Sequence, residues 1–203
     1  PVKSDDGFLD MLVKVDGLLA SLAALTGQFA EGMTRTHAWR FLDFGRRLER
    51  TLQASQLIRA VVAEGGGSDP AALESLLEVS DSLMTYRSRY YSRFQLGAVL
   101  DLLMTDETNP RSMAFQLVEC TSHAAQLPRE SVVPGQITEE RLAASLLHLI
   151  RRTDPLSIAR AYEAGDEKPL DSLLRTIDTT LPKLSCSATP RACPAGSGRP
   201  QPA

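Results

Sequence analysis

Helix start and stop signals recur along this chain and constrain its fold more than any other feature. In Asp69-Pro70, Asn109-Pro110 and Asp154-Pro155, a side chain that can cap a helix precedes a proline, which suits the first helical position. Three consecutive glycines, 65–67, end the helix before the first signal, because glycine costs about 1 kcal/mol relative to alanine in a helix. No stretch alternates apolar and polar residues as a strand does. The pattern therefore predicts an all-α protein.

Apolar residues at alternating steps of three and four place the helices more closely. The longest such stripe runs from Phe8 to Met33 and defines one face of the first helix. We expect a multi-helix bundle of about six to eight helices, with Pro182 at the end of the last one. The expected helices span about 5–32, 36–64, 69–93, 95–104, 109–127, 138–151, 154–164 and 169–181.

The domain organisation follows from length and from a change of composition near the end. A chain of 203 residues suits one domain. The stretch 185–203, SCSATPRACPAGSGRPQPA, has no large apolar residue, so it cannot bury a core. We therefore expect an alpha-helical domain over 1–184 and a disordered tail over 185–203. The first residue is Pro rather than Met, which suggests a domain truncated at its N-terminus.

Composition excludes several classes of protein. The formal net charge is −3, whereas a nucleic-acid-binding domain usually shows a basic excess. No apolar run is long enough to cross a membrane and no signal peptide opens the chain, so we expect a cytoplasmic protein. His37, His123 and His148 lack the spacing of metal ligands, so no metal site is expected. The lone Cys120 of the predicted helices is interpreted as a core residue.

Several arginines fall where a charged side chain is unfavourable. In the second expected helix, Arg46 and Arg50 share a face with Trp39, which indicates burial. Asp43 lies four residues before Arg47, a spacing at which the two side chains can pair on a helix. We therefore expect acidic partners for the arginines of this helix.

Two more arginines are placed unusually. Arg87 falls on the apolar stripe of the third expected helix, so we expect it to be half-buried against an acidic or carbonyl partner. Arg111 would lie in the first turn of the helix that begins at Asn109, where its charge opposes the helix dipole by about 0.3–1 kcal/mol. Asp106 or Glu107, just before that turn, could offset this cost.

Two interpretations of these arginines stay open. The chain has 18 Arg and only 4 Lys, which codon usage alone can produce. The arginines could then form a network of ion pairs that ties the helices together. Alternatively, their planar forks could grip a carboxylate or phosphate in a cleft and stabilise charge as it develops.

Three strings in these same segments resemble a known family. They are GMTRTHAWRFLDFGRRLERTLQ (32–53), SDSLMTYRSRYY (80–91) and VLDLLMTDETNPRSMAFQL (99–117). Together they are similar to the bacterial alpha-E domain, an all-helical domain that occurs alone or fused behind a circularly permuted ATP-grasp domain. The resemblance covers about residues 5–181. It implies that the chain is the C-terminal portion of the domain, because the family's earlier Gly-Arg-x-x-Glu-Arg helix is missing here.

The resemblance implies a role beside an ATP-grasp ligase, and beside transglutaminase-like proteases, in the bacterial synthesis or modification of peptides or amide bonds. The domain would position an anionic substrate, a carboxylate or an acyl phosphate. ATP and Mg would bind only to the ATP-grasp part, because this chain has no glycine-rich phosphate loop. The alternative is a non-catalytic docking module whose charged network only holds the bundle together. Whether the chain itself is an enzyme stays open, because it carries no catalytic motif.

Under the first interpretation, arginines would grip the anion, carboxylates would orient them or act as acid or base, and two aromatic residues would wall the pocket. The candidate anion-binding cluster is Arg46, Glu49, Arg50, Arg87, Asp106, Glu107, Asn109 and Arg111, and the candidate walls are Trp39 and Tyr86.

Overall fold

The computed structural model describes residues 5–91, 93–127 and 139–188. Over these residues it has nine α-helices and no strand, which confirms the all-α prediction. The chain divides into two units, residues 1–39 and 40–203, which are described separately. Of the expected disordered tail over 185–203, residues 185–188 belong instead to the last helix. Residues 189–203 lie outside the described residues, as do the expected loop over 128–136 and the expected cap Thr138.

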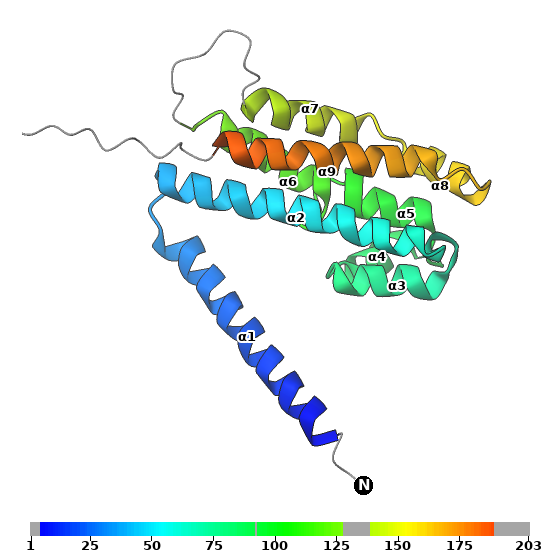
Figure 1. Cartoon of the computed structure of the whole chain (residues 1–203), viewed down its shortest axis with the longest axis horizontal. Coiled ribbons are helices and arrows are strands. Elements are labelled where there is room, and N and C mark those ends of the chain that lie inside the picture. Colours follow the sequence, from blue (N-terminus) through cyan, green and yellow to red (C-terminus); the bar gives the residue numbers. More distant parts are fainter. Residues whose placement is uncertain (1–4, 92, 128–138, 189–203) are drawn as a thin grey trace, which may run out of the picture. The chain divides into compact units, whose positions relative to one another are not determined.

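The helices follow the expected order, with two short elements added between them (Figure 1). A 3-10 turn follows the second helix, and a π-helical segment extends the fifth. The elements are α1 (Asp5–Gly32), α2 (His37–Ala63), η1 (Gly66–Ser68), α3 (Pro70–Val79), α4 (Leu83–Tyr90), α5 (Leu96–Leu100), η2 (Asp101–Thr105), α6 (Met113–Ala124), α7 (Glu139–Arg151), α8 (Pro155–Glu163) and α9 (Lys168–Ala188).

The second unit is a bundle with one apolar core. Helix α7 packs against α6 and α9, and α8 packs against α5 and α9; α7 and α9 lie side by side in Figure 1. Helix α2 is tied to α8 by the buried Tyr162 hydroxyl, which donates to Val62 O at 3.0 Å. Gly67 leaves room for the Tyr162 ring, because a Cβ at that position would lie 2.6 Å from Cε1. This bundle provides the rigid elements on which the candidate site is built.

The helix expected over 69–93 is wrong as a single element, because the chain turns between α3 and α4. Asp81 adopts a φ of 48°, in the left-handed region that ends a helix. Its backbone N–H donates to Glu78 O at 2.9 Å, and the N–H of Ser82 donates to Leu77 O at 2.8 Å. These two bonds form a Schellman motif, the usual way in which terminal helix carbonyls find partners.

Two other helix boundaries also differ from the expectation. Helix α6 begins at Met113 rather than Asn109, because the Ser112 side chain accepts from Phe115 N and caps the helix there. Helix α9 continues through Pro182 to Ala188. The buried Leu181 and Leu184 on either side of Pro182 explain this, because tertiary packing can outweigh the cost of a proline in a helix.

The first unit consists mainly of α1. Most of its large apolar side chains are exposed, from 42% at Leu12 to 70% at Val13. The apolar face predicted from the spacing of these residues is therefore present on α1. No helix among the described residues is long and apolar enough to cross a membrane.

Candidate anion-binding site

The site is built around a buried carboxylate on α2. Asp43 is 8% exposed, and its Oδ2 lies 2.6 Å from Arg47 Nε and 2.8 Å from His123 Nε2 on α6. Burial alone would raise the pKa of Asp43, but the hydrogen bonds and charges of His123 and Arg47 lower it from 3.8 to about 2. Asp43 is thus a stable anion that joins α2 to α6.

Arg47 extends this contact with every nitrogen of its guanidinium. Besides the bond from Nε to Asp43, Nη1 donates to Gln116 Oε1 at 3.3 Å. Nη2 lies 3.6 Å from Glu119 Oε2. The pairing of Asp43 with Arg47 confirms the expectation from their spacing of four residues. Arg47 is therefore committed to the α2–α6 interface.

Gln116 connects this hydrogen-bond network to the loop before α6. Its Nε2 donates to Pro110 O. The Asn109 side chain holds the same loop, because Nδ2 donates to Leu102 O at 2.9 Å and Oδ1 accepts from Arg111 N at 3.1 Å. Arg111 therefore precedes α6 rather than lying in its first turn, and the expected conflict with the helix dipole does not arise.

Arg111 reaches from this loop to the turn between α3 and α4, where it pairs with Asp81. Each of the three strings that carry the family resemblance thus contributes to one place. The first string supplies Arg46 and Arg50, the second supplies Asp81, and the third supplies Arg111.

Arg50 is the distinctive member of this cluster. Partial desolvation lowers the pKa of Arg50, and the nearby positive charges of Arg46, Arg111 and Arg47 lower it further, while the charge of Asp43 raises it. Arg50 is exposed, and its side chain has no hydrogen bond or ion pair with any described residue. Arg46 is only weakly compensated, since its Nη1 lies 3.9 Å from Asp43 Oδ1. The arrangement therefore offers positive charge to an anion from solvent.

The remaining predicted arginine and the two acidic residues before the α6 loop lie in other ion pairs. Arg87 is exposed rather than half-buried, and its Nη2 lies 2.5 Å from Glu74 Oε1. Asp106 pairs with Arg89. Glu107 accepts two hydrogen bonds from Arg151 on α7, at 2.6 and 3.0 Å.

The other three predicted residues are not gathered into the cluster either. Glu49 is exposed on α2. Tyr86 is fully buried, where its hydroxyl donates to Arg93 O and accepts from Gln95 N, so it lies in the core rather than along a surface. Trp39 belongs to the first unit, where the guanidinium of Arg35 lies 4.2 Å from its ring centroid.

Sequence reasoning missed two residues of the site. Nothing in the sequence indicated a role in the site for His123, because a lone histidine on a helix is usually a core residue. The sequence around Asp81 gave a weak indication of a turn, because Asp81 lies between two serines in the middle of a long expected helix. Neither contact could be found from spacing, since His123 is 80 residues from Asp43 and Asp81 is 30 residues from Arg111.

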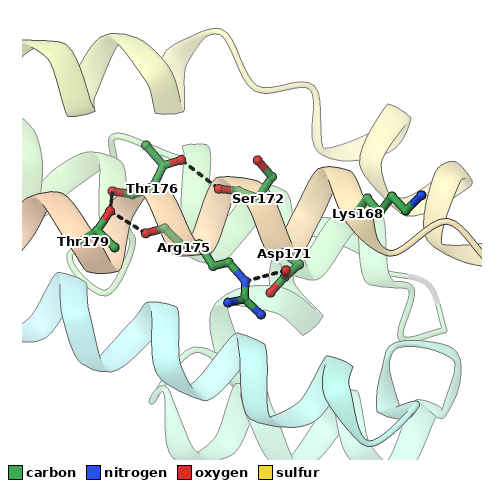
Figure 2. A pocket seen from close by; sticks show the side chains of 6 residues that line it. All are labelled: Lys168, Asp171, Ser172, Arg175, Thr176 and Thr179. Atoms are coloured by element: carbon green, nitrogen blue, oxygen red, sulfur yellow. Dashed lines mark hydrogen bonds and ion pairs between the residues drawn. The ribbon is translucent and has the colours of Figure 1, made fainter.

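Other features of the bundle are less suited to bind a ligand. A surface hollow runs along one face of α9 (Figure 2) and is lined by residues of that helix alone. Its only arginine, Arg175, is already paired with Asp171 at 2.6 Å. Burial raises the pKa of Cys120 to about 12, so this thiol is not a nucleophile. Among the residues that the structure describes, no His, Cys, Asp and Glu side chains are grouped to hold a metal ion.

The fold and the charged strings define a class of all-helical domains with clustered arginines. The chain belongs to the Alpha-E family, described as a predicted alpha-helical domain with a conserved ER motif, whose model matches residues 5–189. Glu-Arg pairs occur here at Glu49-Arg50 and at Glu140-Arg141. Only the first pair lies in a string that carries the resemblance, and its arginine, Arg50, is among the exposed arginines that have no hydrogen bond or ion pair with a described residue.

Full-length relatives are much longer than this chain. It is 29% identical over 182 residues to the uncharacterized protein Mb2597 of Mycobacterium bovis and, to the same extent, to the uncharacterized protein Rv2567 of Mycobacterium tuberculosis. The match covers 88% of this chain but 20% of each relative, so the chain spans about one fifth of their length. No solved structure matches.

Proposed function

We propose that this helical domain binds an anionic group, a carboxylate or an acyl phosphate, and positions it for a circularly permuted ATP-grasp ligase that makes or modifies amide bonds. Arg50 and Arg46 on α2 and Arg111 before α6 would form the anion site. The observation that carries the proposal is the state of Arg50: it is exposed, it lies near other arginines, and no described residue neutralises it by direct contact.

The chemistry of the site suits this role. Arginine binds carboxylates and phosphates through two parallel hydrogen bonds, and several guanidinium groups can share the charge that grows on an acyl phosphate as it reacts. The buried pair of Asp43 and Arg47 holds α2 in place, so the neighbouring arginines are presented from a rigid helix. ATP and Mg would bind to the ATP-grasp partner, and a transglutaminase-like protease is a further proposed partner, as the resemblance implies.

A purely structural role is the second candidate, and the other ion pairs favour it. Arg87, Arg89 and Arg151 each contact a carboxylate, so their presence needs no ligand. The two candidates therefore differ only at the cluster around Arg50. A domain that serves only for docking would make no use of the charge of Arg50 in catalysis, so replacing Arg50 would leave any ligase activity intact.

The test is turnover by the complete protein together with its ATP-grasp partner, supplied with ATP and amino acids. We expect Arg50→Ala to reduce phosphate release at least tenfold, because an arginine that stabilises developing charge contributes on the order of 2 kcal/mol or more. Arg87→Ala is the matched control: it removes the same side chain from an exposed ion pair and should leave turnover within about twofold. Equal turnover in the wild-type and Arg50→Ala proteins would establish the structural alternative.

A further inference from the structure

The residue that faces the site from the α3–α4 turn has an unusual backbone. Asp81 follows Ser80, the C-cap of α3, at the position where the left-handed conformation favours Gly or Asn. A non-glycine residue with a φ of 48° is uncommon, and such outliers concentrate at functional sites. Gly would satisfy the same two backbone hydrogen bonds without strain. Asp adopts this conformation more readily than most residues, and unlike Gly it also brings a carboxylate to the turn.

That carboxylate is the direct partner of Arg111. The Asp81 side chain is 76% exposed and the Arg111 side chain is 44% exposed, so the pair is open to solvent and weak, as exposed pairs are. Arg111 also lies beside α2, because the preceding residue, Pro110, accepts a hydrogen bond from Gln116, which in turn accepts one from Arg47, one turn before Arg50. Asp81 thus neutralises Arg111, whereas Arg50 has no acidic partner among the described residues.

We propose that Asp81 is the resident counter-ion of the anion site, and that a doubly charged phosphoryl group binds by displacing the Asp81 carboxylate from Arg111 while Arg46 and Arg50 hold its other oxygens. This inference rests on the proposed function and deepens it, because it selects the phosphoryl class over the carboxylate class.

Charge and geometry distinguish these two classes. A carboxylate has two oxygens and one charge, which the fork of Arg50 alone can satisfy. At Arg111 it would only replace one carboxylate by another, and Asp81 has the advantage of being held next to its partner by the chain. A phosphoryl group has three oxygens and up to two charges, so it can contact several guanidinium groups at once. Only this ligand gains from the exchange.

The experiment is calorimetric titration of the whole chain at constant ionic strength and pH 8, with inorganic phosphate, sulfate and acetate as probes. We expect phosphate and sulfate to bind at least about tenfold more tightly than acetate. Arg50→Ala should weaken phosphate binding at least about tenfold. Asp81→Asn should tighten it about two- to fivefold, the range set by the strength of an exposed ion pair.

A double-mutant cycle tests whether Asp81 acts through Arg111. In the Arg111→Ala background we expect Asp81→Asn to change phosphate affinity less than about 1.5-fold, because no pair remains to be broken. Glu78→Gln, which removes an exposed charge three residues away, should change it by a similarly small factor. Asn tolerates the left-handed conformation, so Asp81→Asn should stay folded, and Asp81→Gly provides a second variant with the same expectation.

The outcomes separate the two proposals. If phosphate binds and Arg50→Ala does not weaken it, the anion site itself is refuted. If Arg50→Ala weakens binding but Asp81→Asn has no effect, or has the same effect without Arg111, the exchange at Asp81 is refuted while the site stands. Acetate affinity equal to that of phosphate would overturn the choice of a phosphoryl ligand. The absence of any anion binding would overturn both proposals.

Discussion

The buried carboxylate at the α2–α6 interface gives the sharpest prediction about stability. Replacing Asp43 by Asn keeps the size of the side chain and removes its charge. The variant leaves Arg47 and His123 facing a neutral amide, in a place where the two partner side chains are only 17% and 7% exposed. We expect the free energy of unfolding to fall, and to fall more at neutral pH than in acid.

The magnitude follows from the pKa of Asp43. The pKa is lowered from 3.8 to about 2 in the folded protein, and one pKa unit corresponds to 1.36 kcal/mol. The ionised carboxylate therefore stabilises the fold by about 2 kcal/mol. This is a lower limit for Asp43→Asn, because breaking a buried pair also leaves a cation without its partner, which can cost about 3–5 kcal/mol.

The sign of the pH dependence is fixed by the direction of the shift. A carboxyl group with a lowered pKa in the folded state stabilises the protein fully above its unfolded pKa, near 3.8. That stabilisation is lost as the pH falls through the folded value of about 2. Urea denaturation at pH 7, 5, 4 and 3 measures it: the difference between the wild-type protein and Asp43→Asn should be constant from pH 7 to 5 and shrink below pH 4.

A second ion pair of the same geometry provides the control. Arg175 Nε lies 2.6 Å from Asp171 Oδ2 on α9, at the same spacing of four residues and the same distance as Arg47 and Asp43. The α9 pair is exposed, so Asp171→Asn should cost less than about 0.5 kcal/mol. Equal losses for the two variants, or a loss for Asp43→Asn that does not depend on pH, would refute the argument from burial.

Two further predictions concern the same region. Ser112→Ala should lower the free energy of unfolding by about 1–2 kcal/mol, because the hydroxyl caps α6 and donates to Asp106 O; a loss below about 0.3 kcal/mol in urea denaturation would contradict this role. In a variant with Cys186 and Cys193 replaced by serine, Cys120 should resist a thiol reagent at pH 8 until urea unfolds the protein, because burial raises its pKa to about 12. Rapid labelling of the folded variant would show that the thiol is accessible.

The sequence predicted most of the helices correctly because their signals are local. The caps Asp69 and Asp154 each accept a hydrogen bond from the backbone two residues later, as expected from a capping residue before proline. The errors arose where tertiary contacts decide the outcome. Asp81 breaks a helix although its residue type permits one, and Pro182 fails to end a helix because buried leucines lie on both sides of it.

The candidate site could be predicted only in part, for the same reason. Periodicity identified Arg46 and Arg50 as residues on one face of α2. Periodicity could not assign partners. It placed Arg87 on an apolar stripe, although the long side chain reaches outward to Glu74 on α3. Arginine stems can cover apolar surface while the charged end stays in water, so position on a stripe does not imply burial of the charge.

Several contacts in the bundle depend on the guanidinium group, which bears on the abundance of arginine over lysine. The guanidinium of Arg47 contacts Asp43, Gln116 and Glu119 through three different nitrogens. Arg151 uses two nitrogens to bind both oxygens of Glu107. A lysine ammonium has neither the planar fork nor the reach for such contacts, so codon usage alone does not explain arginine at these positions. Structural pairs account for most of these guanidinium groups, whereas Arg50 is exposed, has no such pair among the described residues and lies near Arg46 and Arg111, so its charge is open to a ligand.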